Sequence, residues 1–276
     1  MNCAWKELLS VLPSWIAAEV DMRCKETLQE LRLRLNQPLQ LLCSNEQLWI
    51  GRNVTADDLN FCINTASRYS PWASQSISQG YITAVGGHRI GVCGAVALHG
   101  NTVSTVRSVR SLCIRVARDF PGIAAQFRSL SGSVLIIGPP GSGKTTLLRD
   151  LLRQLSRHET VCVIDEREEL FPDCFCGERG ALDVLSGCPK PTAIDMLLRT
   201  MRPDTIGLDE ITAESDCDAL RLASWCGVRL IATAHASSIS DLENRALYKP
   251  LIHDGFFPYI LTIHTDKTVH QERIRL

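Results

Sequence analysis

The sequence predicts an α/β protein in which a parallel β-sheet domain follows a smaller α+β domain. The first observation is a set of short apolar runs, each long enough for one buried strand, at 133–138, 161–165, 205–210 and 229–235. The second is that helix-like stretches separate these runs, an alternation typical of a parallel sheet with helices on both faces. The helix expected after the first run carries on one face Leu147, Leu148, Leu151, Leu152 and Leu155.

The first 118 residues show a different rhythm and predict the α+β domain. Apolar and polar residues alternate over 28–42 around a turn at 36–38, which predicts two strands of a half-buried sheet. Residues 80–98 repeat the pattern around Gly86-Gly87, where glycine allows the positive φ angles of a tight hairpin. An amphipathic helix broken near Pro13 is expected before these strands.

Pro121-Gly122 is a candidate hinge between domains of residues 1–118 and 119–276. A chain of 276 residues with 45% apolar content is long enough for two domains with cores of their own. The larger domain is expected to end in a hairpin that turns at Asp266-Lys267.

Charge and cysteine content argue against several protein classes. Lys+Arg 29 against Asp+Glu 30 leaves a net charge of -1, so the overall composition gives no reason to expect nucleic-acid binding, and a local basic patch is the alternative left open. No apolar run approaches the ~20 residues of a membrane span, so any membrane association is expected to be peripheral or through a partner. The 12 cysteines are scattered and no signal peptide is evident, which indicates reduced cytosolic thiols. Cys174, Cys176 and Cys188 lack the CxxC spacing of a zinc site.

The strongest motif is GPPGSGKTT at 138–146, which satisfies the phosphate-loop pattern between a predicted strand and a predicted helix. Its backbone N–H groups and the helix N-terminus favour a polyphosphate, and Lys144 adds a charge for the β- and γ-phosphates. Thr145 is expected to ligate Mg²⁺, so the predicted ligands are ATP and Mg²⁺. The predicted nucleotide-binding residues are Gly138, Pro139, Pro140, Gly141, Ser142, Gly143, Lys144, Thr145 and Thr146.

Acidic residues follow two of the predicted strands. We expect Asp209 to orient water bound to Mg²⁺ and Glu210 to polarise the attacking water. Glu166, which follows Asp165 at the end of another strand, is the alternative catalytic base, and the long aliphatic lead-in favours Glu210. A solvated strand end is the competing interpretation for Asp165 and Glu166. His235 closes the fourth strand at the same edge, where either γ-phosphate sensing or a structural role is possible.

Three blocks resemble the ATPases of the bacterial secretion superfamily, the hexameric motors of type II and type IV systems. Residues 198–211 resemble their Walker B box, 163–170 their acidic box and 231–238 their histidine box. Those motors usually carry Gly where this chain has Asp209, so Glu210 is the shared acid.

A closer resemblance covers nearly the whole chain. ELRLRLNQPL, GYITAVGGHRIGVCG, GPPGSGKTTLLRDL and RGALDVLSGCPKP, in that order, resemble the stage III sporulation protein AA family. The resemblance implies a RecA-like P-loop ATPase domain in a motor of the mother-cell cytoplasm. Such a motor powers the channel complex that joins mother cell to forespore, and is expected to associate peripherally with membrane-embedded channel proteins as a homo-hexamer.

The resemblance to secretion motors also implies arginines from the N-terminal domain over the nucleotide. Residues 106–118 offer Arg107, Arg110 and Arg115, one of which is expected to reach the γ-phosphate when the domains close. The alternative is a solvated basic face.

Two other functions fit the phosphate loop: a nucleic-acid translocase or helicase, and a nucleotide-gated scaffold without turnover. The neutral charge and the lack of a basic tract with interleaved aromatics argue against the first. The acids at 165–166 and 209–210 argue against the second, because a pure binder needs no carboxylate to activate water.

Overall fold

The computed structural model describes residues 3–44, 46–68, 80–99, 102–172 and 180–274. They divide into two compact units, which we call unit 1, up to Asp119, and unit 2, from Phe120 onward. Each unit encloses hydrophobic cores built from its own residues.

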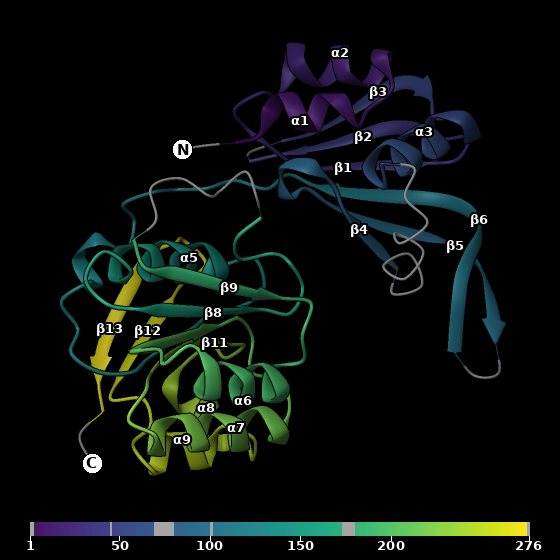
Figure 1. The fold of residues 1–276 in the computed structure, drawn as a ribbon. Helices are drawn as coiled ribbons and strands as arrows, with labels where there is room; N and C mark the ends of the chain where they lie inside the picture. The colour runs from purple at the N-terminus through teal and green to yellow at the C-terminus, as the bar shows by residue number, and fades with distance from the viewer. Residues whose placement is uncertain (1–2, 45, 69–79, 100–101, 173–179, 275–276) are drawn as a thin grey trace. The chain divides into compact units, whose positions relative to one another are not determined.

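Unit 1 is an antiparallel sheet with helices packed against it (Figure 1). Its strands follow the order β3-β2-β1-β6-β5-β4. The helices are α1 (Trp5–Ser10), α2 (Ser14–Arg23) and α3 (Ala56–Ala66), and the strands are β1 (Leu28–Arg34), β2 (Pro38–Cys43), β3 (Gln47–Asn53), β4 (Tyr81–Thr83), β5 (Arg89–His99) and β6 (Thr102–Arg115).

The predicted local features of unit 1 are confirmed. Pro13 separates α1 from α2 because its ring cannot continue a helix. The turn between β1 and β2 has Asn36 at a φ of 58°, a conformation that asparagine tolerates. Gly86 and Gly87 have φ angles of 85° and 73° in the 3₁₀ turn that joins β4 to β5. Strands β3 and β6 were not predicted.

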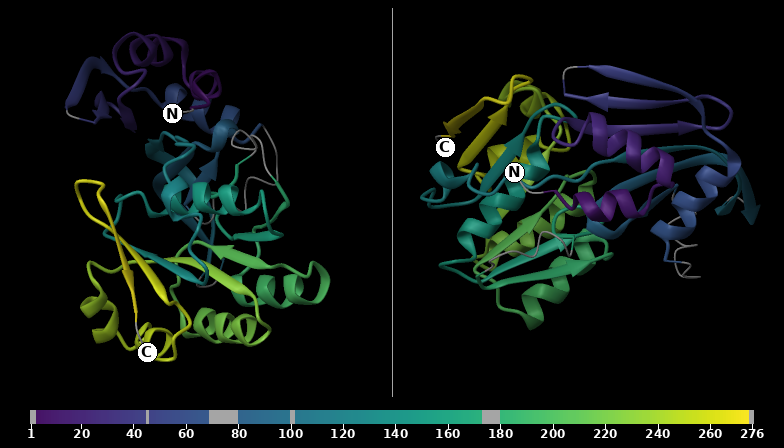
Figure 2. Two further views of the ribbon diagram at one scale, coloured as in Figure 1. Left: turned by 90° about the vertical axis from the view of Figure 1, so that its left-hand side faces the viewer. Right: turned by 90° about the horizontal axis from the view of Figure 1, so that it is seen from above.

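Unit 2 is a mainly parallel sheet in the order β13-β12-β7-β11-β10-β8-β9, with β13 antiparallel to β12. The strands are β7 (Val134–Ile137), β8 (Val161–Asp165), β9 (Leu182–Ser186), β10 (Thr205–Leu208), β11 (Arg229–Ala234), β12 (Tyr259–Ile263) and β13 (Val269–Arg273). The helices are α5 (Lys144–Leu155), α6 (Lys190–Thr200), α7 (Glu214–Trp225), α8 (Ile239–Asn244) and α9 (Lys249–His253). The predicted parallel sheet and closing hairpin (yellow in Figures 1 and 2) are confirmed.

Helices cover both faces of this sheet (Figure 1). Val134 and Ile136 share a core with the leucines of α5, whereas Leu135 and Ile137 pack in the core that contains residues of α6, α7 and α9. This division follows from strand geometry, since successive side chains point to opposite faces. A strand with helices on both faces is apolar throughout, which explains why the central strands were predictable and the half-exposed β9 was not.

Gly207 makes a close approach of β10 to α5 possible. A Cβ atom at this position would lie 2.4 and 2.5 Å from the two methyl carbons of Leu152, which is fully buried. No such contact would form at Gly51, where nothing lies within 4 Å of an added Cβ.

We expect Gly207→Ala to lower the free energy of unfolding by about 1–3 kcal/mol through overpacking. Leu152→Ala alone should cost about 2–5 kcal/mol, and the double variant should cost less than the sum because the new methyl group fills part of the cavity. Urea unfolding of the full chain measures this, with Gly51→Ala as a control expected to stay within about 0.5 kcal/mol. A Gly207→Ala protein as stable as the control would contradict the packing.

Candidate functional site

The phosphate loop joins β7 to α5 and is shaped by glycine. Gly141 and Gly143 have φ angles of 71° and 104°, which favour residues without a Cβ atom. A Cβ at Gly138 would lie 2.6 Å from the Ile263 carbonyl oxygen and 2.6 Å from Ser142 Oγ. The loop is therefore packed against the end of β12, and only glycine fits at its first position.

Lys144, at the start of α5, is 7% exposed. Its Nζ donates to the carbonyl oxygens of Gly138 and Pro139, at 2.8 and 3.0 Å, and lies 3.0 Å from Nδ1 of His235. Burial lowers the pKa of Lys144, while the charges of Asp209 and Glu210 raise it. The ammonium is thus held inside the loop by neutral acceptors.

Ser142 Oγ is a buried hydroxyl in the same loop, and its residue is 4% exposed. It has no hydrogen-bond partner among the residues that the structure describes. A buried hydroxyl normally finds a partner, so this group fits a loop built to receive ligand oxygens.

Asp209 lies directly after β10 and joins two neighbouring elements. Its Oδ2 accepts from Thr145 Oγ1 at 2.8 Å, and its Oδ1 accepts from Thr233 Oγ1 at 2.5 Å. Thr233 Oγ1 in turn accepts from the backbone N–H of Glu210 at 2.8 Å. The predicted metal-site pair, Thr145 and Asp209, is therefore adjacent and offers the oxygen ligands that Mg²⁺ prefers.

Glu210 is held between two nitrogen groups. Arg167 Nη1 lies 2.8 Å from Glu210 Oε2, and His235 Nε2 lies 3.1 Å from Oε1. Because the Lys144 ammonium can only donate to Nδ1 of His235, the proton of a neutral ring is on Nε2 and points to Glu210. One imidazole ring thus links the phosphate-loop lysine to the acid.

Glu210 also has a φ angle of 53°, which is uncommon outside glycine. The strand ends at Leu208, two residues before the predicted end, so both acids belong to the segment after β10.

The acids that follow β8 have different partners. Asp165 is 3% exposed and accepts from the backbone N–H groups of Glu169, Leu170 and Phe171 at 2.8–3.0 Å. Burial raises the pKa of Asp165, and the hydrogen bonds from Phe171 and Leu170 lower it. The Asp165 carboxylate shapes the loop that follows the strand, so a solvated strand end does not describe it.

Glu166 accepts from Lys190 Nζ at 2.6 Å, and Lys190, which is 5% exposed, also lies 3.8 Å from Asp216 Oδ2. Lys190 comes from the start of α6. The Glu166 carboxylate is therefore fixed by a buried ammonium rather than by the phosphate loop.

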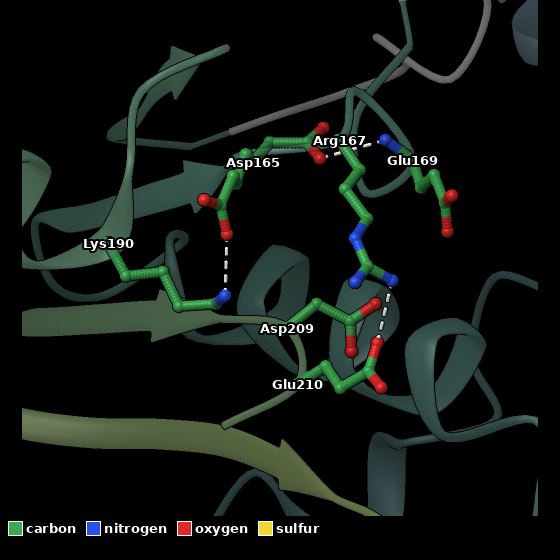
Figure 3. Close-up of a pocket in the computed structure, with 7 residues that line it drawn as sticks. Asp165, Arg167, Glu169, Lys190, Asp209 and Glu210 are labelled. Carbon is green, nitrogen blue, oxygen red and sulfur yellow. Dashed lines mark hydrogen bonds and ion pairs between the residues drawn. The ribbon is translucent and has the colours of Figure 1, made fainter. Parts of the chain in front are cut away.

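Both pairs of acids line one pocket, shown in Figure 3. Arg167 reaches across it toward Glu210, and Lys190 enters from another element (Figure 3). The lining residues are Asp165, Glu166, Arg167, Glu169, Lys190, Asp209 and Glu210. Acidic groups outnumber basic ones among the lining residues, and each pair of acids already has a nitrogen partner.

The predicted arginines belong to unit 1, whereas the phosphate loop and the acids belong to unit 2. Arg107, Arg110 and Arg115 are exposed on β6, and Arg115 Nε lies 3.7 Å from Glu30 Oε2. The described cysteines are free thiols, including Cys188, while Cys174 and Cys176 lie outside the described residues.

Three residues of the site were not identified from the sequence. Arg167 was visible as the basic residue within the acidic run at 163–170, and Lys190 as a cation at the start of a helix. Thr233 gave no signal, because a threonine in an apolar strand is an ordinary β-strand residue.

Comparison with known proteins decides the family. The family model described as "Sporulation stage III, protein AA" matches residues 7–273. Stage III sporulation protein AA of Bacillus subtilis (strain 168) is 34% identical over 95% of this chain and 91% of that protein. The chain belongs to the sporulation stage III protein AA family. The family resemblance predicted from the sequence is thereby confirmed.

Solved structures of other proteins share the fold of this chain. The ATPase DotB of Legionella pneumophila has a TM-score of 0.61 at 15% identity, covering 95% of this chain and 80% of DotB. The pilus retraction motor PilT, solved with bound ADP, has a TM-score of 0.59 at 14% identity, covering 88% of this chain and 76% of PilT. The predicted RecA-like domain preceded by a smaller α+β domain is therefore confirmed. Among the described residues, no helix has both the length and the apolar character to cross a bilayer.

Thr233 and Thr262 offer a matched test of the acid network. Both are buried in the same sheet, but the Thr233 hydroxyl bonds to Asp209 and Glu210, whereas Thr262 Oγ1 has no partner among the described residues. We expect Thr233→Val to lower the free energy of unfolding by about 1–3 kcal/mol, because it leaves an N–H group and a carboxylate oxygen without their partner. Thr262→Val should be neutral or stabilising. Equal effects of the two substitutions in urea unfolding would contradict the network.

Proposed function

We propose that this protein is an ATP-hydrolysing motor whose phosphate loop binds ATP and whose Glu210 activates water. The observation that carries the proposal is the contact chain from Lys144 through His235 to Glu210. It joins the cation expected at the β- and γ-phosphates to the acid expected beside the attacking water. A protein that only binds nucleotide has no use for a link between the phosphate-loop lysine and a water-activating acid.

Nucleotide binding would exchange the partners of Lys144. Its present acceptors are neutral carbonyl oxygens and an imidazole, whereas a phosphate oxygen carries a charge opposite to that of the ammonium. The N–H groups of the loop and the start of α5 would hold the remaining phosphate oxygens. Thr145 and Asp209 would hold Mg²⁺ and its water, and this ion supplies charge neutralisation for the polyphosphate when bound.

Glu210 is better placed than Glu166 to act as the base. Glu210 contacts the ring that also contacts Lys144, whereas Glu166 is paired with the buried Lys190. Arg167 holds the Glu210 carboxylate by a hydrogen bond, and this bond would have to break for water to reach the carboxylate. His235 would couple γ-phosphate binding to Glu210. If Lys144 moves toward the phosphate, Nδ1 of His235 loses its hydrogen bond from the ammonium, and the same ring contacts Glu210 through Nε2.

Family membership and fold support the wider role. We infer that the motor works in the mother-cell cytoplasm, as a homo-hexamer at membrane-embedded channel proteins that join mother cell to forespore. Arg107, Arg110 or Arg115 would complete the site by neutralising charge on the γ-phosphoryl group when the units close at Pro121-Gly122. A nucleic-acid translocase is the second candidate, and stimulation of ATPase activity by nucleic acid would identify it.

Lys144→Ala should abolish productive ATP binding, because the loop has no second buried cation to replace the charge. Equilibrium ATP binding and steady-state ATP hydrolysis by the full chain measure this effect. Lys249→Ala, at an exposed lysine of α9, is a control that should leave both unchanged. Normal turnover by the Lys144→Ala protein would overturn the phosphate-loop assignment.

Glu210→Gln should retain ATP binding but lower single-turnover hydrolysis by about 10²–10⁴-fold, since the amide keeps the size but cannot accept the proton from water. Glu166→Gln should have a much smaller effect. If Glu166→Gln stops hydrolysis while Glu210→Gln does not, the base is on the other strand. If the wild-type chain binds ATP without hydrolysing it, the protein is a scaffold.

A further inference from the structure

The tip of the β12–β13 hairpin contacts the phosphate loop. Lys267 Nζ donates to the carbonyl oxygen of Gly141 at 2.5 Å, although the two residues are 126 positions apart in the chain. Lys267 is exposed, whereas Lys144 is buried. A second lysine is therefore present at this loop, in addition to the buried Lys144.

The hairpin holds Lys267 at this position through its own turn. The Lys267 N–H donates to the His264 carbonyl oxygen at 3.0 Å, and Lys267 has a φ angle of 69°. Asp266 Oδ1 accepts from both the backbone N–H and the hydroxyl of Thr268, at 3.0 and 2.6 Å. The turn is thus closed by bonds that do not involve the lysine side chain, which stays available for other acceptors.

Sheet topology decides which flank of the loop Lys267 approaches. β7 lies between β12 and β11, and β10 lies beyond β11. His235 and Glu210 follow β11 and β10, so the groups assigned to hydrolysis meet the loop from one side. Lys267 follows β12 and meets the loop from the opposite side.

A nucleotide bound with its γ-phosphate toward Glu210 would extend its α- and β-phosphates toward the opposite flank of the loop. We propose that Lys267 leaves the Gly141 carbonyl oxygen and binds the α- and β-phosphates of the nucleotide. This inference rests on the proposed function, because it needs a nucleoside polyphosphate on the loop. An ammonium gains by the exchange, since a phosphate oxygen carries charge and a peptide carbonyl oxygen does not.

The position predicts a role mainly in binding rather than in the chemical step. The α- and β-phosphates are present in both ATP and ADP and are not transferred. Lys267 would already make this interaction with them in the ground state, so its main effect falls on Kd and KM. The charge that develops on the β-phosphate as ADP leaves adds a smaller effect on kcat. Lys267 would thus be a binding residue, in contrast to Glu210.

The test is equilibrium binding of ATP and of ADP to the full chain, together with turnover at saturating ATP. Lys267→Met should raise the Kd for ATP and for ADP by about tenfold each, and should lower turnover at saturating ATP by a smaller factor than the affinity. Lys267→Arg should restore most of the affinity. Lys249→Met, which removes an exposed lysine of α9, is the matched control and should bind as the wild type does. Circular dichroism of each variant checks that the fold is retained.

The possible results separate a failure of this inference from a failure of the proposed function. Equal ATP and ADP affinities in wild type and Lys267→Met overturn this inference and leave the proposed function intact. A loss confined to ATP, accompanied by lower turnover, also overturns it and places Lys267 at the γ-phosphate. A wild-type chain that binds neither ATP nor ADP overturns the proposed function itself.

Discussion

The site depends on the parallel register of β7, β11 and β10. Ile137 pairs with Ala234, and Leu208 pairs with Ala232, so these strands end at the same edge of the sheet. Gly138, His235 and Asp209 follow within one residue of these ends and therefore meet in space. A slip of one residue in β10 would put a larger side chain where Gly207 meets Leu152, so close packing holds the register that the site requires.

Within the site, the charged groups have hydrogen-bond or ion-pair partners in the protein. Lys144 is held by carbonyl oxygens and His235, Glu210 by Arg167 and His235, and Glu166 by Lys190. Burying a charge without a partner is costly, and these contacts reduce that cost. A polyphosphate and a divalent cation would have to exchange these contacts for stronger ones, which couples ligand binding to rearrangement of the acids.

The two units rest on different packing principles. In the antiparallel sheet of unit 1, buried residues of β1 are interspersed with exposed and partly exposed ones, and β3 has no buried residue. The central strands of unit 2 are buried on both faces. Each unit has its own core, so a change in one can leave the packing of the other intact. This division suits the proposed motor, in which movement of a domain accompanies hydrolysis.

The sequence by itself determined the class of fold and the phosphate loop. Central strands such as residues 161–165 are apolar because both faces are buried, and residues 138–145 match the phosphate-loop pattern between a strand and a helix, the setting that this motif requires. Strand β9 and strand β3 were missed because partly exposed strands carry a weak hydrophobic signal. The partners of the acids were decided only by the tertiary structure. Arg167 with Glu210, Lys190 with Glu166 and Lys267 with Gly141 are 43, 24 and 126 residues apart, and strand order, which local sequence does not encode, brings them together.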